Sequence, residues 1–572
     1  MIPAESSIPT TLKNIVPNTR NVAQVTNAMT TASPVLFPAN GVRKLSPKET
    51  MQRMKALSCT LPKDNRPTCS GQVHVGIFFD GTGNNMKDDF ELPPPEKRQH
   101  SNIVRLFHTH RDEPKNGYLR YYIPGVGTPF PEIGDKNKYT GPNRGAAAGE
   151  KGEDRLIWAF TRLLNAPHRF VFGVDLIPND LAKTIVGNVA TPTSPGAMRR
   201  VVLNTWQDKL KAALAGQKPK VEQINLSVFG FSRGSAQARA FVNWLFEVCK
   251  QEGGGWTFAG IPIRLQFLGI FDTVASVGLA NIMDNGVLAG HQGWADNTQE
   301  IHPAVEQCVH FVAGHEVRAC FPLDSVRVKS HYPANAMEIM YPGSHSDVGG
   351  GYAPGALGVS PQQDSFISMI PGVNMYHEAR KSGVPLIAWE QLDKLYQEAL
   401  TPSTTVITDF NTYVRDSKIG SGPVEEMGRR HMSLYFSYRF KHRAAFYQRS
   451  PYVTAPPTDQ GYLHLTQKCL IERLSRLGAG GNAMAPDFNP PQRAELHEKM
   501  MHAAGLPLGL KEKHAIQVAK RIDVRTVKPG IEKFFDQYVH DSMAGFMAMN
   551  MDEYDFNSIG IVKFRTVFKG HD

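Results

Sequence analysis

Runs of apolar residues divide the central part of the chain into alternating strands and helices. Short runs rich in β-branched and aromatic residues are typical of buried strands, and they span 73–79, 118–124, 224–230, 263–274 and 337–341. Other segments carry apolar side chains at helical spacing, namely 153–165, 196–215 and 232–248. Strands that alternate with helices predict an α/β fold with a mainly parallel central sheet covered by helices on both faces.

The pattern changes toward both ends of the chain, which predicts three regions. Residues 1–70 are rich in Thr, Asn, Ser and Pro with little periodicity, so we expect a flexible or partner-binding extension. Residues 71–355 form the predicted catalytic domain, with an insertion at about 168–196 where Pro and Gly interrupt an apolar stretch. Residues 356–572 are more helical and less regular, and we expect them to pack on the catalytic domain as a cap or accessory region.

Composition and charge narrow the function classes only slightly. Charged residues make up 20% of the 572 residues and the net charge is +10, which suits an anionic partner and mere solubility equally well. The basic residues between 511 and 533 are interrupted by Glu512, Asp523 and Glu532, so this segment fits a solvated helix face at least as well as a phosphate-binding patch. We predict no nucleic-acid partner.

Patterns for metals, cofactors and targeting are also incomplete. The six cysteines form no C-x-x-C pair, and the segment at His315-Glu316 begins like a zinc motif without its second histidine. We therefore expect neither a metal nor a cofactor. The N-terminal segment has no signal-peptide pattern, and no run of 18 apolar residues occurs. We expect a protein made and kept in the cytoplasm, or exported without a cleavable signal.

The strongest chemical signal is the pentapeptide G-x-S-x-G at 230–234, which places Ser232 between a predicted strand and a predicted helix. A serine at such a sharp turn is held with its hydroxyl above the sheet, and flanking glycines avoid collisions with the strand and the helix. This context predicts that Ser232 is a nucleophile. The alternative is a tight strand-to-helix turn that happens to contain a serine.

A nucleophilic serine needs a base and a carboxylate that orients the base. In α/β-hydrolases the chain order is serine, carboxylate, histidine, and Asp272 and His345 follow Ser232 in that order. Asp272 ends a predicted strand and His345 lies in a Gly-rich loop after a later one. The alternatives are a loop-capping role for Asp272, a structural role for His345, and Asp347 or Asp541 as the carboxylate.

The oxyanion of an acyl-transfer intermediate needs backbone amides nearby. The amide of Arg233, at the start of the predicted helix after Ser232, is one expected donor. The loop that begins at Asp80 supplies the other, because the small residues Gly81 and Thr82 allow a backbone amide to approach the substrate. Asp80, Asp347 and Asp541 are kept as possible supporting residues.

Five segments, in order, resemble a bacterial and fungal α/β-hydrolase domain: FFDGTGNN, YYIPGVGT, GFSRGSAQAR, GIFDTV and YPGSHSDVGGGY. Within that domain the chain is similar to the first family of antibacterial lipase effectors of the type VI secretion system. The resemblance covers about 71–355, with a weaker echo at 538–546. It implies a triad of Ser232, Asp272 and His345, and phospholipase A activity on the membranes of a competing bacterium.

The resemblance also implies partners and a destination. These are a secretion spike protein that carries the enzyme, an immunity protein that neutralises it in kin, and the periplasm of a target bacterium. Two other classes stay open from the residues alone: a carboxylesterase that acts on soluble or polymeric esters, and a non-catalytic interaction protein with the same fold.

Overall fold

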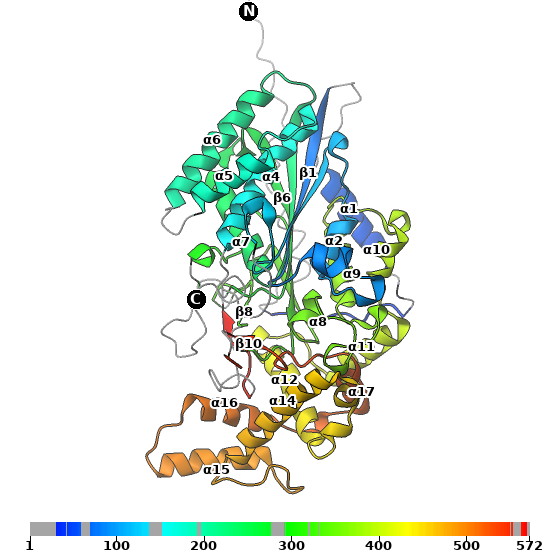
Figure 1. Cartoon of the computed structure of the whole chain (residues 1–572), viewed down its shortest axis with the longest axis vertical. Coiled ribbons are helices and arrows are strands. Elements are labelled where there is room, and N and C mark those ends of the chain that lie inside the picture. Colours follow the sequence, from blue (N-terminus) through cyan, green and yellow to red (C-terminus); the bar gives the residue numbers. More distant parts are fainter. Residues whose placement is uncertain are drawn as a thin grey trace, which may run out of the picture.

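The computed structural model describes residues 30–39, 41, 43–58, 69–136, 151–190, 196–275, 291, 293–318, 321–329, 331–548, 551–552 and 562–568. Its centre is a sheet whose parallel strands lie in the order β2-β1-β3-β6-β7-β9. These strands are β1 (Ser70–Phe79), β2 (Tyr118–Ile123), β3 (Lys220–Phe231), β6 (Ile261–Phe271), β7 (Cys308–Ala313) and β9 (Ala336–Tyr341). The α/β fold with a mainly parallel sheet, predicted from the sequence, is confirmed (Figure 1).

Because all of these pairs are parallel, the carboxyl ends of the strands meet at one edge of the sheet. The register pairs Phe79 with Gly230, Phe231 with Phe271, and Phe271 with Phe311. The residues that follow these strands therefore lie side by side, and the edge of an open α/β sheet where this happens is where ligands bind in such folds.

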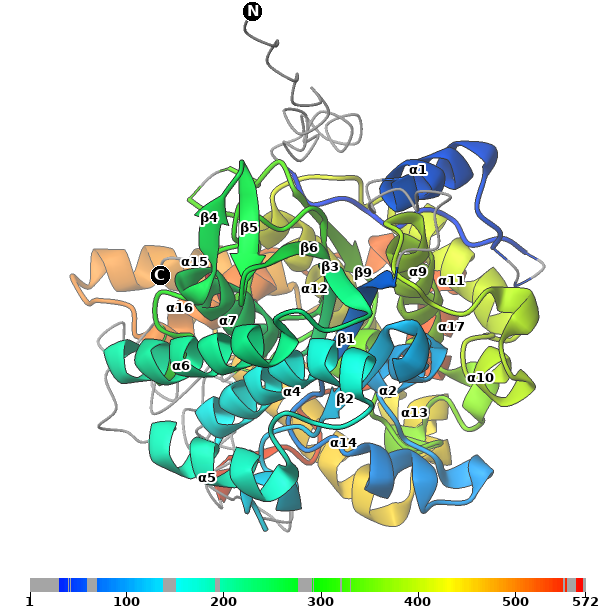
Figure 2. The same ribbon diagram turned by 90° about the horizontal axis from the view of Figure 1, so that it is seen from above.

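Helices cover both faces of the sheet, as Figure 2 shows. On one face, α4 (Gly152–Phe172), α5 (Asn179–Val189), α6 (Gly196–Leu214) and α7 (Arg233–Val248) pack against inward residues such as Ile77, Val228 and Ile270. On the other, α2 (Asn102–Thr109) and α9 (Met369–Lys381) pack against Phe78, Phe229 and Phe271. Successive strand residues thus alternate between two apolar cores, which is the side-chain period of a strand.

The stretch predicted as an insertion at 168–196 is mostly helical where the structure describes it, with a bend at 173–178 between two helices. Helix α4 continues through Pro167 to Phe172, where the aromatic ring of Phe170 lies over Gly71 of β1. Helix α5 follows. The segment around Gly253 forms a hairpin of β4 (Lys250–Glu252) and β5 (Gly255–Phe258), which pairs antiparallel with the start of β6. From the Pro and Gly residues alone, the helices and the hairpin could not be distinguished from irregular loops.

Part of the N-terminal extension packs on the domain. Thr31 exchanges backbone hydrogen bonds with Gly422, and Ala32 does so with β9, its amide on Glu338 and its carbonyl on the Met340 amide. Helix α1 (Pro47–Ser58) lies against α9. The expectation of a flexible or partner-binding extension therefore concerns at most the remainder of 1–70, and residues 1–29 lie outside the described part of the chain.

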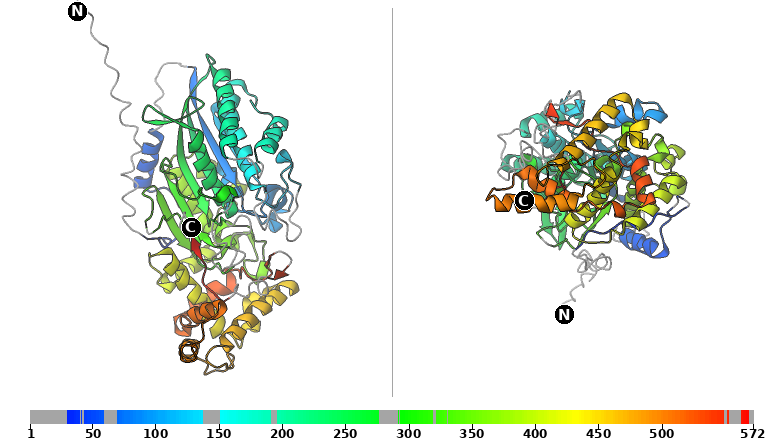
Figure 3. Two further views of the ribbon diagram at one scale, coloured as in Figure 1. Left: turned by 90° about the vertical axis from the view of Figure 1, so that its left-hand side faces the viewer. Right: turned by 90° about the horizontal axis from the view of Figure 1, so that it is seen from below.

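The region after 355 is largely helical, and most of it, α9 apart, gathers at the carboxyl edge of the sheet (Figure 3). It contains α10 (Lys394–Glu398), α11 (Thr404–Ser417), α12 (Val424–Lys441), α13 (Ser450–Thr454), α14 (Pro457–Ser475), α15 (Pro490–Ala503), α16 (Leu510–Ala519) and α17 (Pro529–Gln537). Phe534 and Phe535 of α17 are buried among α11 and α12 side chains. Among the helices that the structure describes, none has the length and apolar character needed to cross a membrane.

Candidate active site

Ser232 occupies a strained turn between β3 and α7. Its backbone has φ 59° and ψ −126°, a conformation that is rare for a residue with a side chain. A Cβ atom at Gly230 would lie 2.5 Å from the Gly234 carbonyl oxygen, and one at Gly234 would lie 2.4 Å from the oxygens of Phe79 and Asp80. Both glycines of the motif are thus required by close packing, as the sequence motif predicts.

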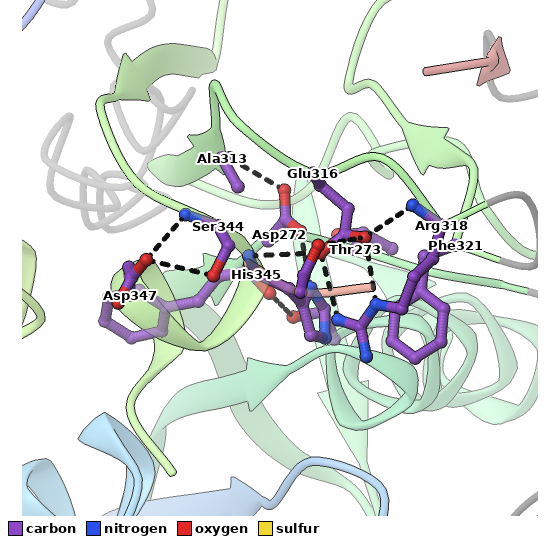
Figure 4. Close-up of polar contacts among 12 residues, drawn as sticks. Asp272, Thr273, Ala313, Glu316, Arg318, Phe321, Ser344, His345 and Asp347 are labelled. Carbon is purple, nitrogen blue, oxygen red and sulfur yellow. Dashed lines mark hydrogen bonds and ion pairs between the residues drawn. The ribbon is translucent and has the colours of Figure 1, made fainter. Parts of the chain in front are cut away.

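Asp272 and His345 meet at the same edge. Asp272 directly follows β6, and His345 begins the short helix α8 (His345–Gly349) after β9. His345 Nδ1 donates to Asp272 Oδ2 at 2.5 Å, as Figure 4 shows. The His345 ring also lies 4.7 Å from the ring of Phe231, the residue before Ser232. The structure therefore brings the predicted carboxylate and histidine together beside the strand end that carries the predicted nucleophile.

Burial and charge set the protonation of this pair. Burial lowers the pKa of His345 below its ordinary value, although Asp272 works in the opposite direction. Burial would raise the pKa of Asp272, but Arg565 and His345 outweigh it and hold that pKa far below its ordinary range. At neutral pH the site thus holds an ionised carboxylate and a neutral imidazole, which is the state a general base needs.

Arg565 is a member of the site that sequence reasoning missed. Its Nη1 and Nη2 donate to the two oxygens of Asp272 at 2.8 and 2.9 Å. The alternation of apolar and basic residues at 562–568 is a weak signal for a strand, and β12 (Val567–Phe568) does pair with β8 (Leu323–Asp324). Nothing in that pattern indicates which carboxylate the arginine contacts, because the two residues are 293 positions apart.

Glu316 and Arg318 form a second charged pair next to His345. This pair was also not predicted from the sequence. Arg318 Nε and Nη2 each donate to Glu316 at 2.9 Å, and the His345 amide donates to Glu316 Oε2 at 3.3 Å. Burial alone would raise the pKa of Glu316, but Arg318 lowers it to about 2. Ser542 Oγ donates to the same carboxylate at 3.0 Å, so the C-terminal region is tied to the histidine-bearing loop.

Asp347 and Asp541 have other partners. Asp347 caps α8 through Ser344 and accepts from His540 Nδ1 at 2.6 Å. Asp541 accepts from Arg439 at 2.5 Å. Neither contacts the His345 ring, so of the three carboxylates considered from the sequence it is Asp272 that does.

The loop after β1 lies against the elbow and holds the other predicted residues. The buried Asp80 accepts hydrogen bonds from Ser101, Tyr122 and the Gly81 amide, and burial raises its pKa to about 7. Because the Gly81 amide is engaged with Asp80, it is not free to bind an oxyanion. Within the described residues the Thr82 amide has no acceptor, and Arg233 begins α7.

Aromatic side chains cover the histidine. The ring of Phe321 meets the His345 ring edge-on at 5.0 Å, and Phe546 meets Phe321 edge-on at 5.4 Å. The Arg318 guanidinium lies 3.6 Å from the centre of the Phe321 ring. Ser232 and His345 are only 3% and 4% exposed. In the part of the chain that the structure describes, no group of three or more His, Cys, Asp or Glu side chains is placed to hold a metal ion.

These features define an α/β protein with a serine at a strand-to-helix turn and a buried Asp–His pair at the same sheet edge, the arrangement that α/β-hydrolases use. Residues 249–378 match the family model of the catalytic domain of Tle1-like phospholipase effectors of the type VI secretion system. This match confirms the resemblance stated from the motifs. The matched range includes Asp272 and His345, and it begins after Ser232.

Two solved structures are similar to different degrees. An uncharacterized protein from Pseudomonas aeruginosa is 26% identical with a TM-score of 0.73, over 95% of this chain and 85% of that one. A Tle1 effector bound to the VgrG spike of the type VI secretion system is 20% identical with a TM-score of 0.26, over 57% of each chain. No curated protein matches the chain.

Proposed function

We propose that the chain is a serine hydrolase that cleaves carboxylic ester bonds of membrane phospholipids, with Ser232 as nucleophile, His345 as base and Asp272 as the orienting carboxylate. The observation that carries this proposal is the buried contact of 2.5 Å between His345 and Asp272, at the edge where the strained turn presents Ser232. The match of residues 249–378 to a phospholipase effector domain supports the substrate class.

In this mechanism His345 takes the proton of Ser232 as the hydroxyl oxygen attacks the ester carbonyl. Asp272 keeps the proton of the imidazole on Nδ1, so that Nε2 is the basic atom, and it stabilises the imidazolium that forms. The oxyanion of the tetrahedral intermediate accepts hydrogen bonds from the amides of Arg233 and Thr82. His345 then protonates the leaving alcohol, and water hydrolyses the acyl-enzyme by the reverse sequence of proton transfers.

The family match also supports a biological role. Phospholipid hydrolysis of the A1 or A2 type would disrupt the membrane of a competing bacterium, so we propose an antibacterial toxin that acts in the periplasm after type VI secretion. Such a role requires two partners, namely a spike protein that carries the effector and an immunity protein that inhibits it. An apolar cover of Phe321 and Phe546 beside His345 suits acyl chains.

The test compares the purified protein with its Ser232→Ala variant on a fluorogenic phosphatidylcholine in vesicles and on a short-chain p-nitrophenyl ester. We expect phospholipid hydrolysis that falls by several orders of magnitude in the variant, because a triad without its nucleophile retains little activity. Ser235→Ala is the matched control, since Ser235 lies in the first turn of α7 and its hydroxyl donates to the Phe271 carbonyl.

Other outcomes would identify other functions. Activity on the short-chain ester alone would indicate a carboxylesterase. If the protein and its Ser232→Ala variant have the same melting temperature and neither substrate is hydrolysed in a Ser232-dependent way, the protein is non-catalytic. Lysophospholipid products analysed by mass spectrometry would show which acyl position is cleaved.

A further inference from the structure

The last described segment of the chain, residues 562–568, reaches the proposed active site from a distant part of the sequence. Its strand β12 pairs in parallel with β8, and the Leu323 amide donates to the Thr566 carbonyl at 2.9 Å. Between these contacts, Arg565 Nε donates to the Phe321 carbonyl at 2.7 Å, and the guanidinium reaches Asp272. The Arg565 side chain is 7% exposed, so it is held in protein on nearly every side.

Within the described part of the chain, the Asp272 carboxylate accepts four hydrogen bonds. Oδ1 accepts from the Ala313 amide at 2.8 Å and from Arg565 Nη1 at 2.8 Å. Oδ2 accepts from Arg565 Nη2 at 2.9 Å and from His345 Nδ1 at 2.5 Å. The two oxygens of a carboxylate offer about four acceptor positions, so these four bonds fill its hydrogen-bonding capacity. The planar guanidinium fixes the plane of the carboxylate, and that plane determines where His345 points.

We propose that Arg565 is a positioning residue of the catalytic machinery: it holds the Asp272 carboxylate in the plane that orients His345 and partly neutralises its charge, so that the C-terminal strand β12 completes the active site. The inference rests on the proposed function for its effect on turnover. Its effect on the histidine does not depend on that function.

The charge effect has a definite sign. Among the described residues, Asp272 bonds to the imidazole and Arg565 bonds to Asp272, while Glu316, paired with Arg318, accepts from the His345 backbone amide. Removing the cation of Arg565 leaves an excess of negative charge next to His345, which favours the imidazolium. The pKa of His345 therefore rises when Arg565 is removed. A residue that only anchored the C-terminal segment would change stability without moving this pKa in a defined direction.

The main variant is Arg565→Ala in the full-length protein. We expect kcat/KM on the short-chain ester to fall about 100-fold, which is typical when reacting groups are misplaced by about 1 Å. The acid limb of the kcat/KM profile should move to higher pH by about one unit. Methylguanidinium at tens of millimolar should restore part of the activity, because it fits the space left by the truncated side chain. Arg565→Lys should be intermediate, since an ammonium cannot bind both oxygens in the plane.

The matched control is Arg449→Ala. Arg449 also makes a two-pronged contact with a carboxylate, donating through Nε and Nη2 to the two oxygens of Asp536 in the helical region. Its loss should lower the melting temperature without moving the pH profile and without rescue by methylguanidinium. If Arg565→Ala behaves like Arg449→Ala in all three measurements, Arg565 only anchors the C-terminal strand and the inference is overturned.

A second measurement works even if the ester assays show no turnover. In protein with ¹³C-labelled histidine, the His345 signal is assigned by its loss in His345→Gln and titrated in Ser232→Ala and in Ser232→Ala/Arg565→Ala. The inference requires a higher His345 pKa in the double variant, and an equal or lower value overturns it. Absent turnover in the wild-type protein, with this shift present, would reject the proposed function and leave the inference in place.

Discussion

The imidazole of His345 donates to the carboxylate of Asp272 at 2.5 Å, and both side chains are buried. Burial removes water as an alternative partner, so this one contact decides which ring nitrogen carries the proton. The carboxylate needs Nδ1 to be protonated, and Nε2 is then free to accept a proton. The pair is thus built to keep a neutral histidine in one tautomer.

Asp272→Asn tests that relationship. The amide group can turn its NH₂ toward His345 and stabilise the other tautomer, and such a change typically costs about 10⁴-fold in kcat. We expect a loss of this order in Ser232-dependent ester hydrolysis, together with a lower melting temperature, because Arg565 would lose its buried anion.

The control separates catalysis from the loss of a buried ion pair. Asp409 is buried and pairs with Lys533 between α11 and α17. Asp409→Asn should lower the melting temperature while leaving kcat within about threefold of the wild type, since it touches none of the proposed triad. Comparable losses of kcat in both variants would show that Asp272 acts only through stability.

The activity should persist at mildly acidic pH. Because burial lowers the pKa of His345, this proposed base stays neutral below the ordinary histidine value of about 6.5. We expect kcat/KM on a soluble ester to be flat at neutral pH and to have an acid limb centred below about 6.5. Samples returned from each pH to pH 7.5 and assayed again would exclude irreversible unfolding. A midpoint above 7 would contradict a neutral buried base.

The free energy of unfolding should also fall with acid. Burial lowers the pKa of several histidines, and each of them binds its proton more readily in the unfolded chain, so acid favours unfolding below about pH 6.5. The members of this group include His74, His100, His108, His110, His315, His377 and His431. Asp80, Asp89 and Glu153 act in the opposite direction, because burial raises their pKa values to about 7, 6 and 7.

Since the histidines outnumber these carboxyls, the melting temperature should drop as the pH is lowered from 6.5 to 4.5. Asp80→Asn provides an internal check by calorimetry. Asp80 binds its proton more tightly in the folded state, so it stabilises the fold on acidification and partly offsets the histidines. The melting temperature of the variant should fall more steeply than that of the wild type between pH 7 and 5. A shallower fall would show that protonation of Asp80 destabilises the folded state.

The sequence was sufficient for the features that local pattern determines. Strand and helix spacing predicted the α/β class, and the glycines around Ser232 predicted a turn whose close packing is seen at Gly230 and Gly234. Asp272 and His345 were predicted together because each follows a strand, and parallel strand ends meet at one edge.

What the sequence could not provide are contacts between distant segments. Arg565 and Ser542 reach the site through the way the helical region folds back, and no local pattern encodes that path. Strand β7, which supplies the Ala313 amide to Asp272, was not among the predicted strands. The Gly81 amide was predicted as an oxyanion donor, and only the structure shows that Asp80 occupies it.

The aromatic cover over His345 leads to the last prediction. Among the described residues Phe546 contacts Phe321 and the Arg318 guanidinium and not the His345 ring, so it lies in the outer layer of the site, and it is only partly buried. A side chain in this position can contact the acyl chain of a long lipid without contacting a short ester. Phe546→Ala should therefore affect the two substrates differently.

We expect Phe546→Ala to lower kcat/KM on a long-chain phospholipid about 10-fold, since two methylene groups that lose apolar contact cost about 1.6 kcal/mol. Turnover of a short-chain ester should change less than about twofold, because the Asp272–His345 contact is not altered. The control is Tyr447→Ala, at an aromatic residue that is 41% exposed in the helical region. It should leave kcat/KM on both substrates unchanged. Equal losses on both substrates would show that Phe546 supports the position of Phe321 and His345 and does not bind lipid.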